Sequence, residues 1–549
     1  MAGSAAVMSL YAVGKQDTYL DGKDPIFDFN QRRHSNFTKF QRSTKIKKPA
    51  TTTSTQWPFN ETIQVVLNPQ QMGDLLCNMF LKCTLPSNFV VDGSFDYAAD
   101  VGKALIKTIE FRVDEFELET LYTDWAVVYD ELYMTEEEKD AIRFLDNNGQ
   151  PSGTMASEAD KDIVKGDIKL FVPLHFFFGR RHSTQDFDNK LLNDSYFKPY
   201  FPLCAIHKQK IFLNITFNDK TFFANPPDDV SMELSQFEIV TEEITLTPLE
   251  RSYIINNKQT ITTELMRRQS PLDIDSFFVE AKNNLVPNIP VKTLHWFFRR
   301  DEFENDPREI ANRFNFGNYY NGANTTSNIY LQAENPIMSD ARLFINGTQN
   351  LGFMEAEARN STSTANYFKH QVPFKVGLSA PLRNIYTYSF SLKPKDPLPT
   401  GALDFSQLNS DKTFLLASLL ETGKESTVTT TSTQNDVTAT LTATVSTRQT
   451  GTTLTVTATA NCLSTITVYQ NDSIISISSN PTLSTTQDVS TTSINNTFFM
   501  TASNVANGTS TTAPISLIKP PLVYKYHLYY TGYQTLEFEN GFLRPMFST

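Results

Sequence analysis

Apolar and polar residues alternate along most of the chain, and this alternation predicts β-strands. From Leu75 to Leu85 every odd-numbered residue is apolar, Lys82 and Thr84 lie between them, and Pro86 ends the run. A period of two is typical of a strand with one buried face. The same signal predicts strands at residues 63–67, 109–113, 168–172, 211–217 and 237–246, and again at 276–281, 291–298, 341–346, 385–392 and 522–530.

Helical signals are few. Thr135 followed by Glu138 has the pattern of a capping box, and residues 248–256 are predicted to form a connecting helix. Two successive runs of short strands predict an all-β protein with two consecutive eight-stranded β-sandwiches. A sandwich with eight strands protects its sheet edges well when it is arranged as a jelly roll.

These patterns give the domain boundaries. We place the first jelly roll at residues 58–247, a connecting segment at 248–270, and the second jelly roll at 271–424 and 515–549. The intervening residues 425–514 hold 28 Thr and only five charged residues. Apolar residues alternate with Thr over 437–445 and 454–460. This alternation favours an inserted Ig-like β-sandwich over a disordered, glycosylated stalk.

Residues 1–57 are predicted to form a basic arm. A Thr-rich stretch at 50–55 follows seven basic residues with no acidic residue among them: Arg32, Arg33, Lys39, Arg42, Lys45, Lys47 and Lys48. Such a segment is expected either to contact nucleic acid or an anionic membrane surface, or to form a solvated or partner-pairing tail. Phe37 and Phe40 within it favour docking onto a partner.

Composition narrows the class of protein. With 549 residues and 40% apolar residues the chain can bury a large core, and a net charge of −12 argues against a protein that coats nucleic acid. Four Cys exclude a disulfide-stapled secreted scaffold. No apolar run is long enough to cross a bilayer, and no basic residue precedes the apolar residues 5–13, so neither a membrane span nor a signal peptide is expected.

Catalytic and metal-binding patterns do not stand out. The sequence has no phosphate-binding loop, no dinucleotide fingerprint and no nucleophile elbow, and its seven His are scattered. His175 and His295 lie in Phe-rich strand patterns and are interpreted as structural, as are Cys77 and Cys83. The acidic residues 301–306 lack the pattern of a calcium loop. We therefore expect no enzyme, cofactor or metal site, although a glycosidase with carboxylates distant in sequence stays an alternative.

Several blocks, in order along the chain, resemble the major capsid proteins of nucleocytoplasmic large DNA viruses. The most specific runs from Tyr386 to Ser406 and includes Pro399-Thr400-Gly401-Ala402-Leu403-Asp404-Phe405-Ser406. The others are residues 17–22 with 32–37, 73–76, 122–125, 172–178 and 343–347. The chain departs from the family pattern at 27–30 and after Gly347, and 425–514 lie outside the pattern.

The resemblance implies a double jelly roll that forms homotrimeric, pseudo-hexagonal capsomers, which tile the icosahedral shell of the virion. In such proteins the N-terminal region faces the interior, so the basic arm would contact minor capsid proteins or the inner viral membrane. Residues 425–514 would project outward, toward the host surface or glycans, and no direct nucleic-acid binding is expected. Two alternatives stay open: a lectin-like or carbohydrate-active β-sandwich protein, and a minor or penton capsid component.

Overall fold

The computed structural model describes most of the chain from Phe40 to Met546. The described residues are 40–49, 56–58, 61–86, 89–90, 93–94, 97–147, 168–180, 200–225, 233–275, 280–306, 309–318, 329–352, 367–395, 399–419, 424–434, 437–448, 451–460, 465–470, 473–478, 482–489, 495–504, 508–511, 515–518 and 523–546. None of the helices in these ranges combines the length and the apolar character needed to cross a membrane.

The first sandwich packs a six-stranded sheet against a four-stranded sheet. The larger sheet runs β1 (Phe40–Lys47), β12 (Glu233–Leu246), β4 (Leu75–Leu85) and β10 (Phe201–Pro202), with β2 (Gln56–Pro58) also paired to β12 and β9 (Ile168–Leu174) to β4. The smaller sheet runs β3 (Thr62–Leu67), β11 (Ile211–Phe217), β7 (Ile106–Val113) and β8 (Phe116–Tyr122). A two-stranded ribbon, β5 (Phe89–Val90) and β6 (Gly93–Ser94), stands apart.

The second sandwich repeats this arrangement. Its larger sheet runs β13 (Gln259–Asp275), β30 (Val523–Glu539), β15 (Pro290–Arg300) and β18 (Tyr386–Ser389), with β19 (Leu403–Asp404) and β31 (Phe542–Pro545) at its margins. Its smaller sheet runs β14 (Glu280–Asn284), β20 (Phe414–Leu419), β16 (Met338–Ile345) and β17 (Thr348–Gly352). Eight main strands per sandwich agree with the predicted pair of eight-stranded units.

Short helices connect the strands. The predicted capping box is confirmed at the start of α4, where Thr135 and Glu138 bond each other's backbone N–H groups, and the predicted connecting helix is α6. The described helices also include several that the sequence did not predict. The α-helices are α2 (Val101–Leu105), α3 (Thr123–Tyr133), α4 (Glu136–Asp146), α5 (Lys220–Phe223), α6 (Pro248–Asn256), α7 (Asp301–Asn305), α8 (Ile329–Glu334) and α9 (Val372–Lys375).

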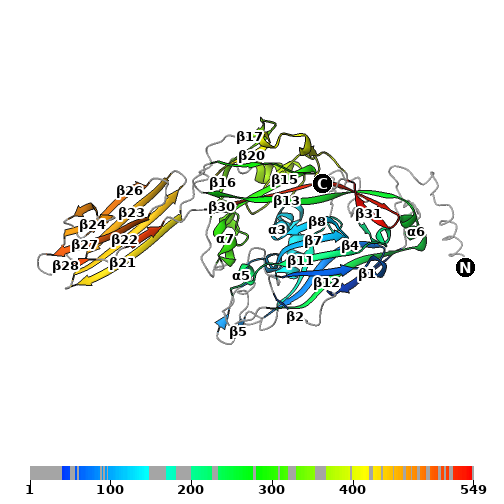
Figure 1. Ribbon diagram of the computed structural model, residues 1–549, viewed down its shortest axis with the longest axis horizontal. Helices are drawn as coiled ribbons and strands as arrows, with labels where there is room; N and C mark the ends of the chain where they lie inside the picture. Colours follow the sequence, from blue (N-terminus) through cyan, green and yellow to red (C-terminus); the bar gives the residue numbers. More distant parts are fainter. Residues whose placement is uncertain are drawn as a thin grey trace, which may run out of the picture.

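The sheet β13-β30-β15-β18 joins the two sandwiches, and its strand β15 is buried on both faces. Along β15 every residue from Val291 to Arg300 is buried. Leu294, Trp296 and Phe298 enter the core of the second sandwich, whereas Phe297 belongs to the core of the first. Figure 1 accordingly places β13, β30 and β15 between the outer strands of the second sandwich and the strands of the first. The continuous apolar run thus reflects burial on two sides.

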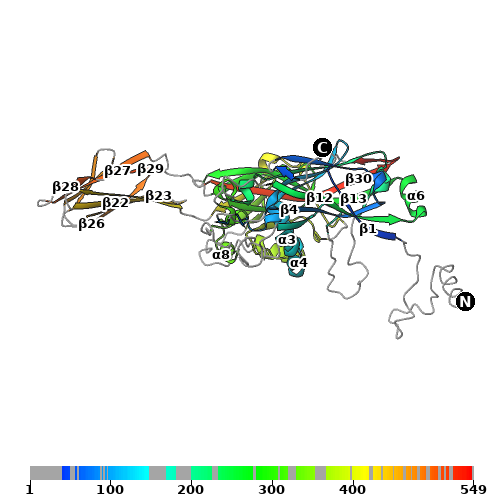
Figure 2. The same cartoon turned by 90° about the horizontal axis from the view of Figure 1, so that it is seen from below.

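The Thr-rich insertion forms two facing sheets. One runs β21 (Lys424–Gln434), β22 (Val437–Arg448), β23 (Gly451–Ala460) and β26 (Thr482–Val489); the other runs β25 (Ser473–Ser478), β24 (Thr465–Gln470), β27 (Asn495–Asn504) and β28 (Gly508–Thr511), with β29 (Ile515–Ile518) also paired to β27. Strands of this regularity rule out the disordered stalk. The unit projects from the body at the end opposite to α6 and β1 in both Figure 1 and Figure 2.

Three predicted boundaries differ from the structure. Residues 40–47 were assigned to the arm, but β1 pairs with β12 along its whole length, from Phe40 opposite Leu246 to Lys47 opposite Ile239. Residues 259–270 were assigned to the connecting segment, but they belong to β13 and pair with β30. The insertion reaches beyond residue 514, because β29 pairs with β27. In each case a partner strand distant in sequence decides the boundary.

Candidate functional site at the junction of the two sandwiches

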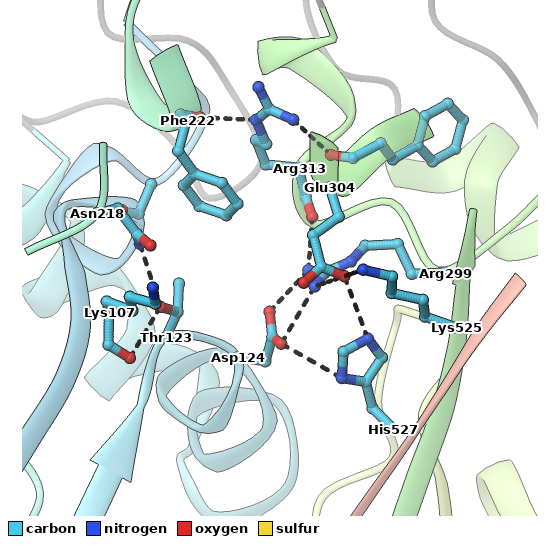
Figure 3. Close-up of polar contacts among 12 residues, drawn as sticks. Lys107, Thr123, Asp124, Asn218, Phe222, Arg299, Glu304, Arg313, Lys525 and His527 are labelled. Atoms are coloured by element: carbon cyan, nitrogen blue, oxygen red, sulfur yellow. Dashed lines mark hydrogen bonds and ion pairs between the residues drawn. The ribbon is translucent and has the colours of Figure 1, made fainter. Parts of the chain in front are cut away.

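A buried ionic cluster fixes the junction where the two sandwiches meet. Asp124 lies in the first turn of α3, and Arg299 ends β15 of the joining sheet. The guanidinium donates to both carboxylate oxygens of Asp124, at 2.7 and 3.3 Å, and its Nη2 lies 3.0 Å from Glu304 of α7. Figure 3 shows these side chains converging from both sandwiches. A bidentate pair of this kind constrains distance and orientation together.

His527 of β30 completes this cluster. Its Nε2 lies 3.5 Å from Glu304 Oε2 and its Nδ1 lies 3.8 Å from Asp124 Oδ2. Burial lowers the pKa of His527, although both carboxylates oppose the shift. Burial also raises the pKa of Glu304, but Arg299, His527 and Lys525 outweigh it and hold that pKa well below its usual range. Glu304 therefore stays ionised beside Arg299 and Lys525, which lie 3.0 and 3.8 Å from its carboxylate.

Arg313 secures the same region through backbone carbonyls. Its guanidinium donates to the carbonyl oxygens of Thr221 and Phe222 in the first sandwich and of Phe303 and Asp306 in the second. Burial lowers the pKa of Arg313 to about 10. Five donors in a planar group allow one side chain to bind four carbonyls.

A second ionic cluster lies between α2, α3, α4 and the residues before β18. Lys103 is surrounded by Asp130 at 2.8 Å, Asp146 at 3.1 Å and Asp100 at 3.8 Å. Arg383 of the second sandwich reaches in and pairs with Asp100 at 2.8 Å and with Glu131 at 3.3 Å. Burial raises the pKa of Asp146 to about 6, against the attraction of Lys103.

Glu119 of β8 makes a third crossing contact. Its buried carboxylate accepts from Arg180 Nη2 at 2.6 Å, from the backbone N–H of Phe177 at 2.9 Å, and from that of Met266 in β13 at 3.0 Å. Three donors satisfy a carboxylate that burial would otherwise penalise. Met266 is thereby tied to the first sandwich through its backbone.

The residues singled out as structural in the sequence are confirmed in that role. His295 is fully buried in the joining sheet, within 3.1 Å of the hydroxyls of Tyr133, Thr293 and Thr387, and burial lowers its pKa to about 3. His175 stacks on Tyr129. Cys77 and Cys83 are buried in the core and form no disulfide.

The described residues contain no group of His, Cys, Asp and Glu arranged to hold a metal ion. In the acidic stretch, Glu304 pairs with Arg299, Glu302 with Arg300, and Asp301 with Lys525. These carboxylates thus balance cations of the chain itself.

Four of the seven predicted basic residues lie on or beside β1; Arg32, Arg33 and Lys39 fall outside the described residues. Lys45 lies 2.8 Å from buried Glu243, Lys48 lies 3.3 Å from Glu238, and Arg42 lies 3.9 Å from Glu242. Part of the charge assigned to partner contacts is therefore balanced by β12. The sequence signal missed this pairing because the three acidic residues lie about 200 positions away.

Two family models match this chain in succession. Residues 25–242 match the model described as "Major capsid protein N-terminus", and residues 242–464 match "Large eukaryotic DNA virus major capsid protein". The chain belongs to this family. It is accordingly a structural component of a viral capsid shell. The border between the two matches falls in β12, the last strand of the first jelly roll.

Individual relatives agree with the assignment. This capsid protein is 24% identical to the major capsid protein of Pyramimonas orientalis virus over 74% of the chain and 90% of that protein. It is 23% identical to the major capsid protein of Paramecium bursaria Chlorella virus 1, over 80% of the chain and 94% of that protein. It spans half of the length of Capsid protein 1 of Acanthamoeba polyphaga mimivirus, at 23% identity over 55% of the chain.

Solved structures confirm the double jelly roll. PBCV-1 VP54, fitted into a reconstruction of the virophage Sputnik, gives a TM-score of 0.56 at 15% identity and covers 95% of this chain and 100% of that one. The quasi-atomic model of the PBCV-1 virus capsid gives the same TM-score at 14% identity and the same coverage.

The first prediction concerns Asp124. The substitution Asp124→Asn leaves buried Arg299 with one carboxylate. We therefore expect the free energy of unfolding to fall by roughly 3 kcal/mol. Asp301→Asn is the matched control, since that half-exposed carboxylate pairs with Lys525 and should cost less than about 1 kcal/mol. Thermal unfolding measures both, and equal melting temperatures would contradict a junction held by this cluster.

The second prediction concerns pH. Because the pKa of Asp146 is higher in the folded state than in the unfolded chain, its contribution favours folding at pH 4 and is lost as pH rises through 6. Asp146→Asn removes this titration, so its stability relative to wild type should rise by roughly 2 kcal/mol between pH 4 and pH 7. Denaturant unfolding at several pH values measures the difference. Exposed Asp140→Asn on the same helix should show no such trend, and a flat Asp146→Asn difference would refute the prediction.

Proposed function

We propose that three copies of this chain form a pseudo-hexagonal capsomer that tiles an icosahedral shell. Two sandwiches with the same sheet plan, fixed side by side, give one chain two similar walls, so three chains present six. The observation that carries this proposal is the joining sheet: because its strand β15 is buried on both faces, the two sandwiches keep one mutual orientation in every copy. The family is structural, and we infer a role in assembly rather than catalysis.

Exposed apolar side chains on one flank support a trimer contact there. Phe144 of α4 is 63% exposed, Tyr330 of α8 is 71% exposed, and Phe374 of α9 is 84% exposed. Figure 2 shows α3, α4 and α8 gathered on the same side of the body. Large exposed apolar residues are costly in a monomer and typical of obligate interfaces. We place the trimer contact on this flank.

Opposite ends of the molecule suggest which side faces outward. The end with β1 and α6 would face the capsid interior, where Arg32, Arg33 and Lys39, with Arg42, Lys45, Lys47 and Lys48, would contact minor capsid proteins or the inner viral membrane. The insertion, at the far end in Figure 1, would project outward toward the host surface or its glycans. Direct binding of nucleic acid is not part of this proposal, because the net charge of −12 opposes it.

Native mass tests the trimer. Light scattering of the purified protein should give a stable species of about 186 kDa, three times the chain mass of 62.1 kDa. Phe374→Glu should shift the mass toward the monomer, because it would bury a charge in an apolar contact. Leu249→Glu, equally exposed but on α6, is the matched control and should stay trimeric. A monomeric wild type would favour the lectin-like or carbohydrate-active alternative, and a trimeric Phe374→Glu would move the contact elsewhere.

Antibody binding to intact particles tests the orientation. Antibodies raised against residues 425–514 should bind intact virions, whereas antibodies against residues 1–39 should bind only after disruption. Binding of the second antibody to intact particles, or failure of the first, would reverse the proposed orientation.

A further inference from the structure

An open groove lies between helix α6 and strand β1, which Figure 1 and Figure 2 both place at one end of the body. It encloses about 540 Å³, a volume within the usual range of binding sites. Leu75, Ile244 and Leu246 line it from the large sheet of the first sandwich. Phe40 lines it from β1, and Tyr253 lines it from α6. We call this mostly apolar site the α6–β1 groove.

Aromatic side chains on both sides of the groove are exposed. No residue of α6 is buried, and its Tyr253 is 64% exposed. Phe40 of β1 is 57% exposed. A helix of nine residues depends on packing of its apolar face, because its own hydrogen bonds stabilise it only marginally. Two large aromatic side chains in water beside one groove indicate that another segment covers it.

Strand β1 offers an open edge beside the groove. It pairs with β12 through all eight residues without a bulge, and no other described strand pairs with it. An edge strand of this length and regularity is a template for one more strand. A strand added there would lie about 4.8 Å from β1, within reach of Phe40 and Arg42 in the groove. The site therefore suits an extended segment, which combines backbone pairing with apolar anchors.

Charge narrows the choice of segment. Arg42 lines the groove and is 67% exposed, and its ion pair with Glu242 is long, at 3.9 Å. Glu250, also in the lining, accepts from the Thr247 hydroxyl at 2.9 Å. The groove thus presents a cation that suits an acidic segment.

Three other occupants fit this chemistry less well. Residues 31–39, which directly precede β1, hold three basic residues and no acidic one. The strand β1 of a second copy carries the same positive charge, so like charges disfavour both. A lipid could fill the apolar part of the groove, but it has no backbone to pair with β1.

The chain itself contains a segment with the required chemistry. Residues 17–30 have four Asp and one Lys, with five apolar side chains among them. Within them Phe27-Asp28-Phe29-Asn30 alternates, which is typical of a strand with one apolar side. The nine residues 31–39 connect the segment to Phe40 and can span up to about 30 Å, enough to reverse back onto β1. Because it is tethered, the segment meets the groove at a high effective concentration.

We propose that residues 17–30 occupy the α6–β1 groove of their own chain, with residues 27–30 added to the open edge of β1. Aromatic residues of the segment cover the two sides of the groove, and its carboxylates balance Arg42. The contact closes the basic residues 32–39 into a loop at this end of the body. It lies within one chain, so it does not rest on the proposed trimer.

Hydrogen–deuterium exchange of the purified full-length protein tests the contact. Amides 26–30 should exchange at least roughly tenfold more slowly than in the synthetic peptide 17–30 free in solution. Tyr253→Ser removes one apolar side of the groove and should bring this exchange close to that of the free peptide. Leu249→Ser makes the matched change on the same helix outside the groove lining, and it should leave the exchange as in wild type.

A second pair of variants tests the charge. Arg42→Glu reverses the cation of the groove and should also release residues 26–30. Lys48→Glu is its matched control, because Lys48 is equally exposed at 67% but lies about 20 Å farther along the chain. Slow exchange of the β12 amides in every variant shows that the sandwich stays folded.

Carbodiimide cross-linking identifies the chain that supplies the segment. In protein assembled from a mixture of unlabelled and isotope-labelled chains, carboxylates of residues 17–30 should join lysine amines of β1 that carry the same label. Cross-links between different labels would overturn the proposal, since the occupant would then be a second copy.

Two results of the exchange experiment would also overturn it. One is fast exchange of residues 26–30 in wild type, and the other is slow exchange that neither Tyr253→Ser nor Arg42→Glu changes. If vesicles of anionic lipid slow the exchange of α6 while residues 26–30 stay fast, the groove belongs to a membrane instead. Native mass measures the trimer separately, so failure of the trimer and failure of this contact remain distinguishable.

Discussion

The sheet β13-β30-β15-β18 is the element on which the rest of the structure depends, because its strand β15 is buried on both faces. In β15, Leu294, Trp296 and Phe298 fill the core of the second sandwich, whereas Phe297 faces the first sandwich. The face toward the first sandwich also holds His295 and Arg299, which cannot stay unpaired away from water. Hydrophobic contact alone would let two sheets slide, but these groups need partners at hydrogen-bond distance, so the mutual position of the sandwiches is fixed.

Sequence reasoning predicted the strands well and the junction poorly, for a physical reason. A strand such as Ile211–Phe217 is encoded by its own alternation, so its bounds were predicted as the structure has them. The partner of a strand is not encoded locally: β1 looked like a free basic arm because Glu238, Glu242 and Glu243 lie far away in sequence. The block that contains Asp124 resembles the capsid protein family, but its pairing with Arg299 depends on a contact between segments distant in sequence. The only local hint was a pair of Arg residues ending an apolar strand.

The strands of the insertion are stabilised differently from those of the body. A unit that projects into solvent needs strands that are stable without a large core, and Thr combines a high preference for strands with a hydroxyl that water can solvate. Cross-strand Thr pairs, such as Thr431 with Thr440, contribute small stabilising contacts that do not depend on salt. A charge-poor insertion of this kind also avoids the repulsion that a strongly acidic projection would meet in a chain with a net charge of −12.

The ion pairs that cross the junction all have the same polarity. Among the described residues, each ion pair that crosses it takes its carboxylate from the first sandwich and its cation from the second: Glu117 with Arg267, Asp124 with Arg299, and Asp100 and Glu131 with Arg383. Two sandwiches with the same sheet plan could otherwise pair like with like between chains. Such a pairing would set carboxylates against carboxylates in a buried contact, at a cost of several kcal/mol. The division of charge therefore selects the one pairing, first with second, on which a two-walled subunit is built.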